Sequence, residues 1–366
     1  MMSGIFHYTL LSSFLLLNPL CMRLLTERVN NRIYEKIGYW FSVIVLMFLS
    51  AFRADTVGND THEYLRIFKE ITIISDSGSR YEIGYVWLNK MVSFISSNPQ
   101  SIIIITSIFI FYSYGYFIWK YSKSPWLSLF VFFTFNGFAF ALSGIRQSIA
   151  LTILLYSYDY FGKEKYLRSL FCILLATAFH STAIIFVIVF LWKKFKINLK
   201  IICFTIVSGI FCYYLFSSIL QYIYILFPAY ELYYDGGRYF GDTRLASVIN
   251  LVVIFIMFCF CYSSLFNKYS KKRIDEKEMI NNNYMLLLFL IAVVINIVAL
   301  KLNLLDRVTL YFSIYSIVLL PNALHVLPKE RRVFYTPIII SLLYVYYMII
   351  LIYRPEWNNI YPYSFC

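Results

Sequence analysis

Residues 101–119 read SIIIITSIFIFYSYGYFIW, nineteen consecutive residues without a charged side chain. A transmembrane helix needs about 20 mainly apolar residues to cross the hydrocarbon core of a bilayer, so this stretch predicts a membrane-spanning helix. Ten further apolar runs begin near Ile5, Ile37, Trp126, Gln147, Leu170, Leu199, Ala246, Tyr284, Leu304 and Phe334. The sequence therefore predicts an all-α fold, a polytopic transmembrane helix bundle with about eleven apolar segments.

The composition supports a membrane protein. Of the 366 residues, 60% are hydrophobic and 14% are charged, and the mean hydropathy is +0.69, which excludes an ordinary soluble domain. The formal net charge of +13 lies mostly in short loops, where Lys and Arg set topology and attract anionic membrane lipid. No nucleic-acid partner is therefore expected. The seven cysteines lack metal-binding spacing, and we expect neither a metal nor another cofactor. Residues 1–366 are predicted to form a single integral membrane domain.

Basic residues in short loops predict the orientation of the spans, because such loops stay in the cytoplasm. If residues 170–192 crossed the membrane once, the lysines at 193–200 would lie outside and every later loop would be inverted. We therefore predict that this stretch turns back near His180 as two half-length helices, with the apex toward the outer face. A miscounted first span is the alternative. The loops expected in the cytoplasm contain Lys120 and Lys123, Lys163 to Arg168, Lys193 to Lys200, Lys268 to Lys277, and Lys329 to Arg332.

This topology places two further regions on the outer side. Residues 53–100 form the longest polar stretch. Within it, residues 81–95 have Tyr85, Leu88, Val92 and Ile95 at helical spacing, which predicts an interfacial helix with Trp87 as an anchor. Residues 354–366 form a short outer tail. Both regions are expected outside the cytoplasm.

Ionisable residues gather on the predicted outer side, where their default interpretation is functional because charges at membrane depth are costly. Arginine binds phosphate through a planar fork of donors, and a cluster of arginines suits a pyrophosphate. The residues concerned are Arg53, Asp55, Asp60, Glu82, Arg146, His180, Arg238, Asp242, Arg244, Asp306 and Arg307.

Simpler roles remain open for several of these residues. Arg53 follows a span and fits an anchor at its end. A lone histidine such as His180 is commonly a hydrogen-bonded core residue, and Asp60 and Glu82 fit solvated loop acids. Arg307 and Tyr311 are four residues apart on one helix face, which fits a shared ligand or ordinary packing. Arg146 lies in the turn at 143–146. This turn is too tight to form a solvated surface, which favours a role for Arg146 beyond anchoring the helix.

Five short motifs occur in a recognisable order. They are RADTVGNDTHEY at Arg53 to Tyr64, YEIGY at Tyr81 to Tyr85, GIRQSIA at Gly144 to Ala150, AFHSTA at Ala178 to Ala183, and DRVTLY at Asp306 to Tyr311. This succession resembles the EpsG family of bacterial exopolysaccharide and capsule polymerases, which are Wzy-like. The family usually has a G-[TS]-D element after the arginine, and here Asn59 stands at its middle position.

The resemblance implies transfer of a growing glycan from undecaprenyl pyrophosphate to a lipid-linked oligosaccharide repeat unit at the outer leaflet of the bacterial cytoplasmic membrane. A chain-length regulator and a flippase are then possible partners. The implied functional set is Arg53, Asp60, Tyr64, Glu82, Arg146, His180 and Arg307. Of these, His180, Asp60 and Glu82 are the candidate catalytic residues, since the acceptor hydroxyl must lose a proton. The arginines and Tyr64 would bind the pyrophosphate or glycan. Tyr311 joins this group by its spacing from Arg307, and Arg238 by its position alone.

Two other function classes fit the same sequence. A transporter or flippase for a lipid-linked saccharide would also place Arg and His along a substrate path, but it should have paired broken helices in two related halves. A membrane acyltransferase that modifies the polysaccharide would also use a His beside an apolar channel.

Overall fold

The computed structural model describes residue 11 and residues 32–73, 81–192, 195–226, 245–266, 273–302, 304–357, 359–360 and 362–366. These residues form helices and connecting turns without a β-strand, and the only extended pairing among them is an isolated bridge. The chain divides into two compact units. Unit 1 comprises Met1–Ile184 and Pro328–Cys366, and unit 2 comprises Ile185–Leu327. The predicted all-α fold class is confirmed.

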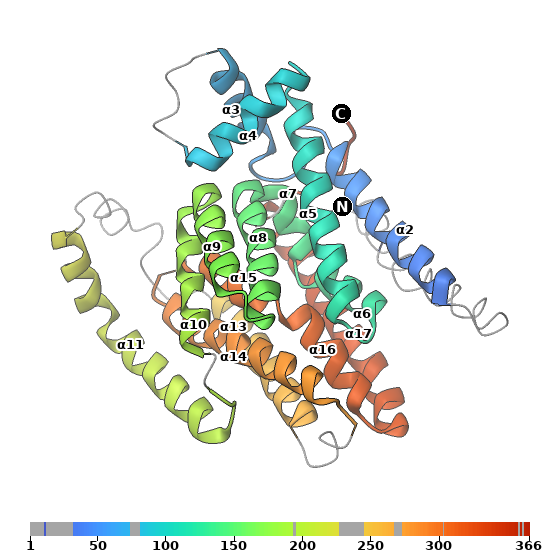
Figure 1. Cartoon of the computed structure of the whole chain (residues 1–366), viewed down its shortest axis with the longest axis vertical. Helices are drawn as coiled ribbons and strands as arrows, with labels where there is room; N and C mark the ends of the chain where they lie inside the picture. The colour runs from blue at the N-terminus through green and yellow to red at the C-terminus, as the bar shows by residue number, and fades with distance from the viewer. Residues whose placement is uncertain are drawn as a thin grey trace. The chain divides into compact units, whose positions relative to one another are not determined.

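Unit 1 is built around α5 and α8, which pack against each other. Helix α2 lies along α5, and α9 lies along α8 (Figure 1). Helices α3 and α4 contact each other and α5. The helices of this unit are α2 (Arg32–Ala51), α3 (Thr61–Ile73), α4 (Ile83–Ile95), α5 (Gln100–Tyr121), α6 (Pro125–Thr134), α7 (Gly137–Ser143), α8 (Ile145–Gly162), α9 (Tyr166–Phe179), α17 (Lys329–Tyr353) and the short 3₁₀ helix η5 (Pro355–Trp357).

Unit 2 is organised around α14, whose side chains are mostly buried. Asp275 caps the start of α14 by accepting a hydrogen bond from the backbone N–H of Glu278, as expected of an N-cap aspartate. Helices α11, α13 and α15 all pack on α14. The helices of this unit are α10 (Val189–Trp192), α11 (Leu199–Leu226), α13 (Leu245–Leu265), α14 (Glu276–Ala299), α15 (Leu305–Ser313) and α16 (Ser316–Val326).

Within the described residues, six helices are long and apolar enough to cross a membrane: α2, α5, α11, α13, α14 and α17. Two bent pairs, α6 with α7 and α15 with α16, raise this number to eight if each pair is one span. The chain is thus a multi-pass membrane protein. Ten of the eleven predicted apolar runs coincide with helices, and the run near Ile5 lies outside the described residues. The count of eleven spans is not confirmed.

The stretch at 170–192 is interrupted at His180. Helix α9 ends at Phe179, and His180 has an extended backbone with φ −154° and ψ 113°. The 3₁₀ helix η2 (Ser181–Ile188) then leads into α10. The two apolar helical stretches, Tyr166–Phe179 and Ser181–Leu191, are each too short to span a bilayer. The predicted break is present, whereas the reversal of direction and the cytoplasmic position of both ends stay predictions.

The predicted helix at 81–95 forms as α4, but its buried face differs from the expected one. Tyr85 and Val92 are buried as the spacing suggested, whereas Ile95 is 80% exposed. The buried face is completed by Val86 and Asn89. An apolar stripe is left exposed, formed by Ile83, Trp87, Met91 and Phe94. This stripe suits an interfacial helix better than the predicted face did.

Candidate functional site

The first turn of α8 positions Arg146. Gly144 ends α7 and also precedes α8, so the tight turn expected at residues 143–146 is the junction of two helices. Arg146 is the second residue of α8, where backbone N–H groups lack partners within the helix. This end of a helix carries a partial positive charge and favours anions.

Three predicted site residues meet at this turn. The Arg146 guanidinium forms an ion pair with Glu82, the residue that precedes α4. Their side chains are 30% and 22% exposed, so the pair is accessible to solvent. Tyr64 on α3 lies within electrostatic reach of Arg146, whose positive charge opposes the rise in the pKa of the Tyr64 hydroxyl. Residues separated by up to 82 positions in the sequence therefore form one polar cluster.

This cluster retains hydrogen-bonding capacity. The Nε–H of Arg146 is buried and has no hydrogen-bond acceptor, and the buried hydroxyl of Tyr85 also has no partner. The Tyr64 and Tyr85 rings lie edge to face with their centroids 5.8 Å apart. Burial raises the pKa of Tyr64 above its ordinary value, although Arg146 opposes the shift. Tyr64 is therefore protonated at neutral pH and acts through hydrogen bonds, not as a base.

Arg53 differs from Arg146 because its side chain is completely buried. Its Nε donates to Thr61 Oγ1 at 3.1 Å, Nη2 donates to the Leu142 carbonyl at 2.9 Å, and Nη1 donates to the carbonyl and hydroxyl of Ser50. Burial lowers the pKa of the guanidinium to about 10, which still leaves it charged at neutral pH. Arg53 thus joins the end of α2, the start of α3 and the end of α7.

The loop before α3 carries Asp60, which is half-buried. Gly58 has a φ of +88°, and a Cβ atom there would lie 3.0 Å from the Leu142 carbonyl oxygen. The backbone N–H of Asn59 donates to Ser143 Oγ at 3.1 Å. The charge of Asp60 also helps to raise the pKa of Tyr64. The loop therefore docks on the α7–α8 junction, beside Arg146.

His180 lies where α9 meets α4. A Cβ atom added to Gly84 would be 2.8 Å from the Ala178 carbonyl oxygen, so the backbones of the two helices touch at this point. Gly84 is two residues after Glu82 in the sequence. His180 is half-buried, and its Nδ1 is 2.8 Å from the Thr182 hydroxyl. His180 therefore lies near the start of α4, and its direct contact with substrate stays a prediction.

The remaining predicted residues lie elsewhere. Arg307 and the buried Tyr311 are on α15 of unit 2, so their contribution to the Arg146 cluster stays a prediction. Arg238 and Asp242 lie outside the described residues. Within the described part of the chain, no three His, Cys, Asp or Glu side chains gather closely enough to hold a metal ion.

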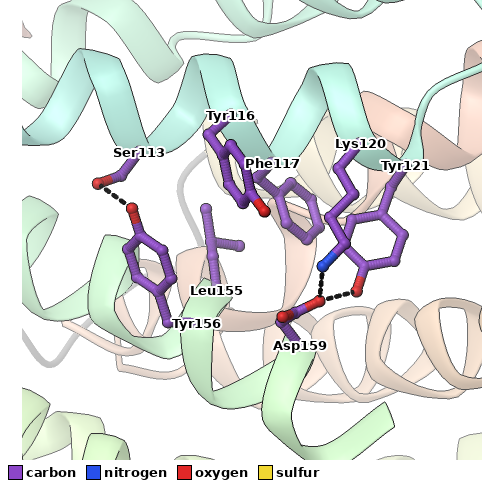
Figure 2. Close-up of a pocket in the computed structure, with 8 residues that line it drawn as sticks. All are labelled: Ser113, Tyr116, Phe117, Lys120, Tyr121, Leu155, Tyr156 and Asp159. Carbon is purple, nitrogen blue, oxygen red and sulfur yellow. Dashed lines mark hydrogen bonds and ion pairs between the residues drawn. The ribbon is translucent and has the colours of Figure 1, made fainter. Parts of the chain in front are cut away.

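A second polar cluster lies at the other end of α8. Asp159 pairs with Lys120 of α5 and accepts a hydrogen bond of 2.6 Å from the Tyr121 hydroxyl (Figure 2). Asp159 also pairs with Lys163. Thirteen residues separate Asp159 from Arg146 on one helix, a distance of about 20 Å along its axis. The adjoining groove is lined by Ser113, Tyr116, Phe117, Lys120, Tyr121, Leu155, Tyr156 and Asp159. The two ends of α8 therefore carry different chemistry, with lysines at the end predicted to face the cytoplasm.

A comparison against family models identifies the same family that the motifs resemble. The model of the EpsG family matches residues 36–365. The chain belongs to the EpsG family. EpsG proteins are Wzy-like polymerases, so this chain is a member of a family of polysaccharide polymerases. Comparison with curated proteins and with solved structures found no match.

Sequence reasoning missed the groups that organise this EpsG site. Thr61, Ser50 and the Leu142 carbonyl hold Arg53, and two of these three groups lie outside the residues that the motifs singled out. Residues near the end of the sequence also bond to the loop between α2 and α3 that carries Asp60. Gly144, directly before α8 and two residues before Arg146, was an available signal, because glycine commonly stands at helix boundaries.

Proposed function

We propose that the chain transfers a growing glycan from undecaprenyl pyrophosphate to a lipid-linked oligosaccharide repeat unit at the outer leaflet of the bacterial cytoplasmic membrane. The observation that carries this proposal is Arg146 at the start of α8, paired with Glu82 and with its buried Nε–H still lacking an acceptor. A phosphate oxygen is the natural acceptor for such a donor.

The chemistry needs two kinds of group. The acceptor hydroxyl oxygen attacks the anomeric carbon of the growing glycan, and the bond from that carbon to the pyrophosphate oxygen breaks. The electron pair leaves with the pyrophosphate, so negative charge grows there. Arg146 and the first N–H groups of α8 would stabilise that charge. The hydroxyl proton goes to a base, for which His180, Asp60 and Glu82 are the candidates.

Glu82 and Arg146 hold each other before substrate binds. An incoming pyrophosphate competes with Glu82 for the guanidinium, because both are anions that fit its planar fork. Displaced from Arg146, the Glu82 carboxylate becomes available to the acceptor hydroxyl. The ion pair would in this way couple binding of the leaving group to release of a base.

Transport of a lipid-linked saccharide is a second candidate function, and one observation favours it. Each unit contains a bent helix pair, α6–α7 with a bend of 57° and α15–α16 with a bend of 42°. Transporters place discontinuous helices of this kind in corresponding halves. The Arg146 cluster is positioned for leaving-group chemistry, and we therefore rank transport second. No comparable observation favours the acyltransferase.

A strain that lacks the protein separates these functions. We expect its lipid-linked glycan to consist of single repeat units on the outer surface, because export continues while joining stops. Repeat units retained inside the cell would indicate a transporter. Full-length chains that lack an acyl group would indicate an acyltransferase. Either of these two outcomes contradicts the proposed polymerase.

A further inference from the structure

The C-terminal segment, which we define as the described part of residues 354–366, returns to the loop that carries Asp60. Arg53 and Phe365 form an antiparallel β-bridge. On either side of it, the N–H of Ala54 donates to the Ser364 carbonyl at 2.9 Å and the N–H of Cys366 donates to the Phe52 carbonyl at 3.0 Å. Residues 364–366 are therefore bonded directly to the start of the loop between α2 and α3 that carries Asp60, which we call the site loop.

A second set of bonds fixes the other end of the loop. The N–H of Gly58 donates to the Asn359 carbonyl at 2.9 Å, and the side-chain amide of Asn59 donates to the Trp357 carbonyl at 2.6 Å. The hydroxyl of Tyr363 donates to the Leu49 carbonyl at the end of α2. The C-terminal segment thus contacts the loop immediately before Asp60 as well as at its beginning.

These bonds matter because the loop has little internal structure. Between α2 and α3, its own backbone bonds include Val57 N–H to Ala54 and a long one of 3.4 Å from Thr61 N–H to Gly58. The N–H groups of Ala54 and Gly58 have their acceptors in the C-terminal segment. A backbone N–H without an acceptor is costly when buried, so the segment helps to determine the loop conformation.

We propose that the C-terminal segment is a positioning element of the polymerase site. This inference rests on the proposed function of the Arg146 cluster. The segment fixes the loop at Gly58 and Asn59, and the loop in turn holds Asp60 and the start of α3, from which Tyr64 reaches Arg146. Arg146 itself is held by α8 and does not depend on the segment.

A truncation tests this proposal. Removal of residues 357–366 leaves α17 (Lys329–Tyr353) complete, so we expect normal abundance in the membrane. Polymer formation should fall at least tenfold, while binding of the lipid-linked repeat unit, which depends on Arg146, should change less than threefold. The matched control is Arg354→Gln with Glu356→Gln, which alters an exposed ion pair of the same segment and should leave polymer at the wild-type level. Wild-type polymer from a normally abundant truncated chain would overturn the proposal.

A cross-link provides the second measurement if the truncated chain is poorly expressed. Phe52 and the native Cys366 face each other beside the β-bridge, so Phe52→Cys should form a disulfide with Cys366 when the other cysteines are replaced by serine. The linked protein should retain polymer formation, and Phe52→Cys with Cys366→Ser should not cross-link. Absence of the link, or activity that returns only on reduction, would overturn the proposal. The wild-type chain in the same assay tests the proposed function separately.

Discussion

Arg53 and Arg146 carry the same charge but have opposite environments. Arg53 is enclosed by neutral hydrogen-bond acceptors, whereas Arg146 is half-buried, pairs with Glu82 and retains an unbonded Nε–H. The family resemblance assigned both to the functional set, and the sequence alone left Arg53 open as a phosphate ligand or as an anchor at the end of a span. It could not separate them, since the acceptors around Arg53 are mainly backbone carbonyls and hydroxyls that no charge pattern reveals.

This contrast predicts different effects of alanine at the two positions. Arg53→Ala leaves buried acceptors without donors and opens a cavity, which should destabilise the protein by about 3–5 kcal/mol. Arg146→Ala should instead abolish polymer with little effect on stability. Thermal unfolding of the solubilised protein and polymer formation in membranes measure the two effects. An Arg53→Ala protein that unfolds normally but makes no polymer would assign Arg53 to substrate binding.

His180 is the candidate base that allows the clearest substitution test. As a base, His180→Ala should slow polymerisation by roughly 10²- to 10⁴-fold while membrane abundance and precursor binding stay normal. His180→Gln should not restore the rate, because an amide donates a hydrogen bond but is a very poor base. A partial rescue by Gln together with weakened binding would indicate a phosphate ligand. Normal polymer from His180→Ala would end the catalytic assignment.

Helix contacts were harder to predict than the helices themselves. The apolar runs located most of the apolar helices. The break at His180 was predicted because the lysines at 193–200 would otherwise lie outside the cytoplasm. The close approach of α4 and α9 did not follow from the sequence, because only the missing side chain of Gly84 permits it. The C-terminal segment escaped prediction for a similar reason. Its bonds to residues 52–59 are mainly between backbone atoms about 300 positions apart, which leave no side-chain pattern.

The α4–α9 contact gives a prediction for Gly84→Ala. A Cβ atom there would lie 2.8 Å from the Ala178 carbonyl oxygen, and a backbone atom cannot move aside as a side chain can. We expect α9 to shift and polymer formation to fall, since His180 ends that helix. Gly115→Ala is the matched control, because its Cβ would meet only side-chain atoms of Trp40 and Val43. Equal, mild effects of the two substitutions would show that the α4–α9 contact does not position His180.

At the scale of the whole molecule, the orientation in the membrane stays a prediction, and the two ends of α8 provide residues with which to test it. Arg146 lies in the first turn of the helix, and the Asp159–Lys120–Lys163 cluster lies about 20 Å further along it. Because basic residues favour the cytoplasmic side, we predict that Arg146 lies toward the outer leaflet. The orientation of residues 193–200 depends in addition on the predicted reversal near His180.

Cysteine labelling tests this topology. In a chain without native cysteines, Lys196→Cys should react with a membrane-impermeant maleimide only after the cells are opened. Asp55→Cys, in the predicted outer loop, should react in intact cells, and Lys165→Cys should behave like Lys196→Cys. Labelling of Lys196→Cys in intact cells would contradict the reversal near His180.

The central claim is that Arg146 stabilises the pyrophosphate leaving group during glycan polymerisation. Its most direct test is polymer length from lipid-linked repeat units added to vesicles that contain the purified protein. We expect the wild type to produce a ladder of products. Arg146→Lys should be slower by about 10²- to 10³-fold, nearly as slow as Arg146→Ala, because a point charge cannot replace the planar fork. A wild-type ladder from Arg146→Lys would contradict the claim.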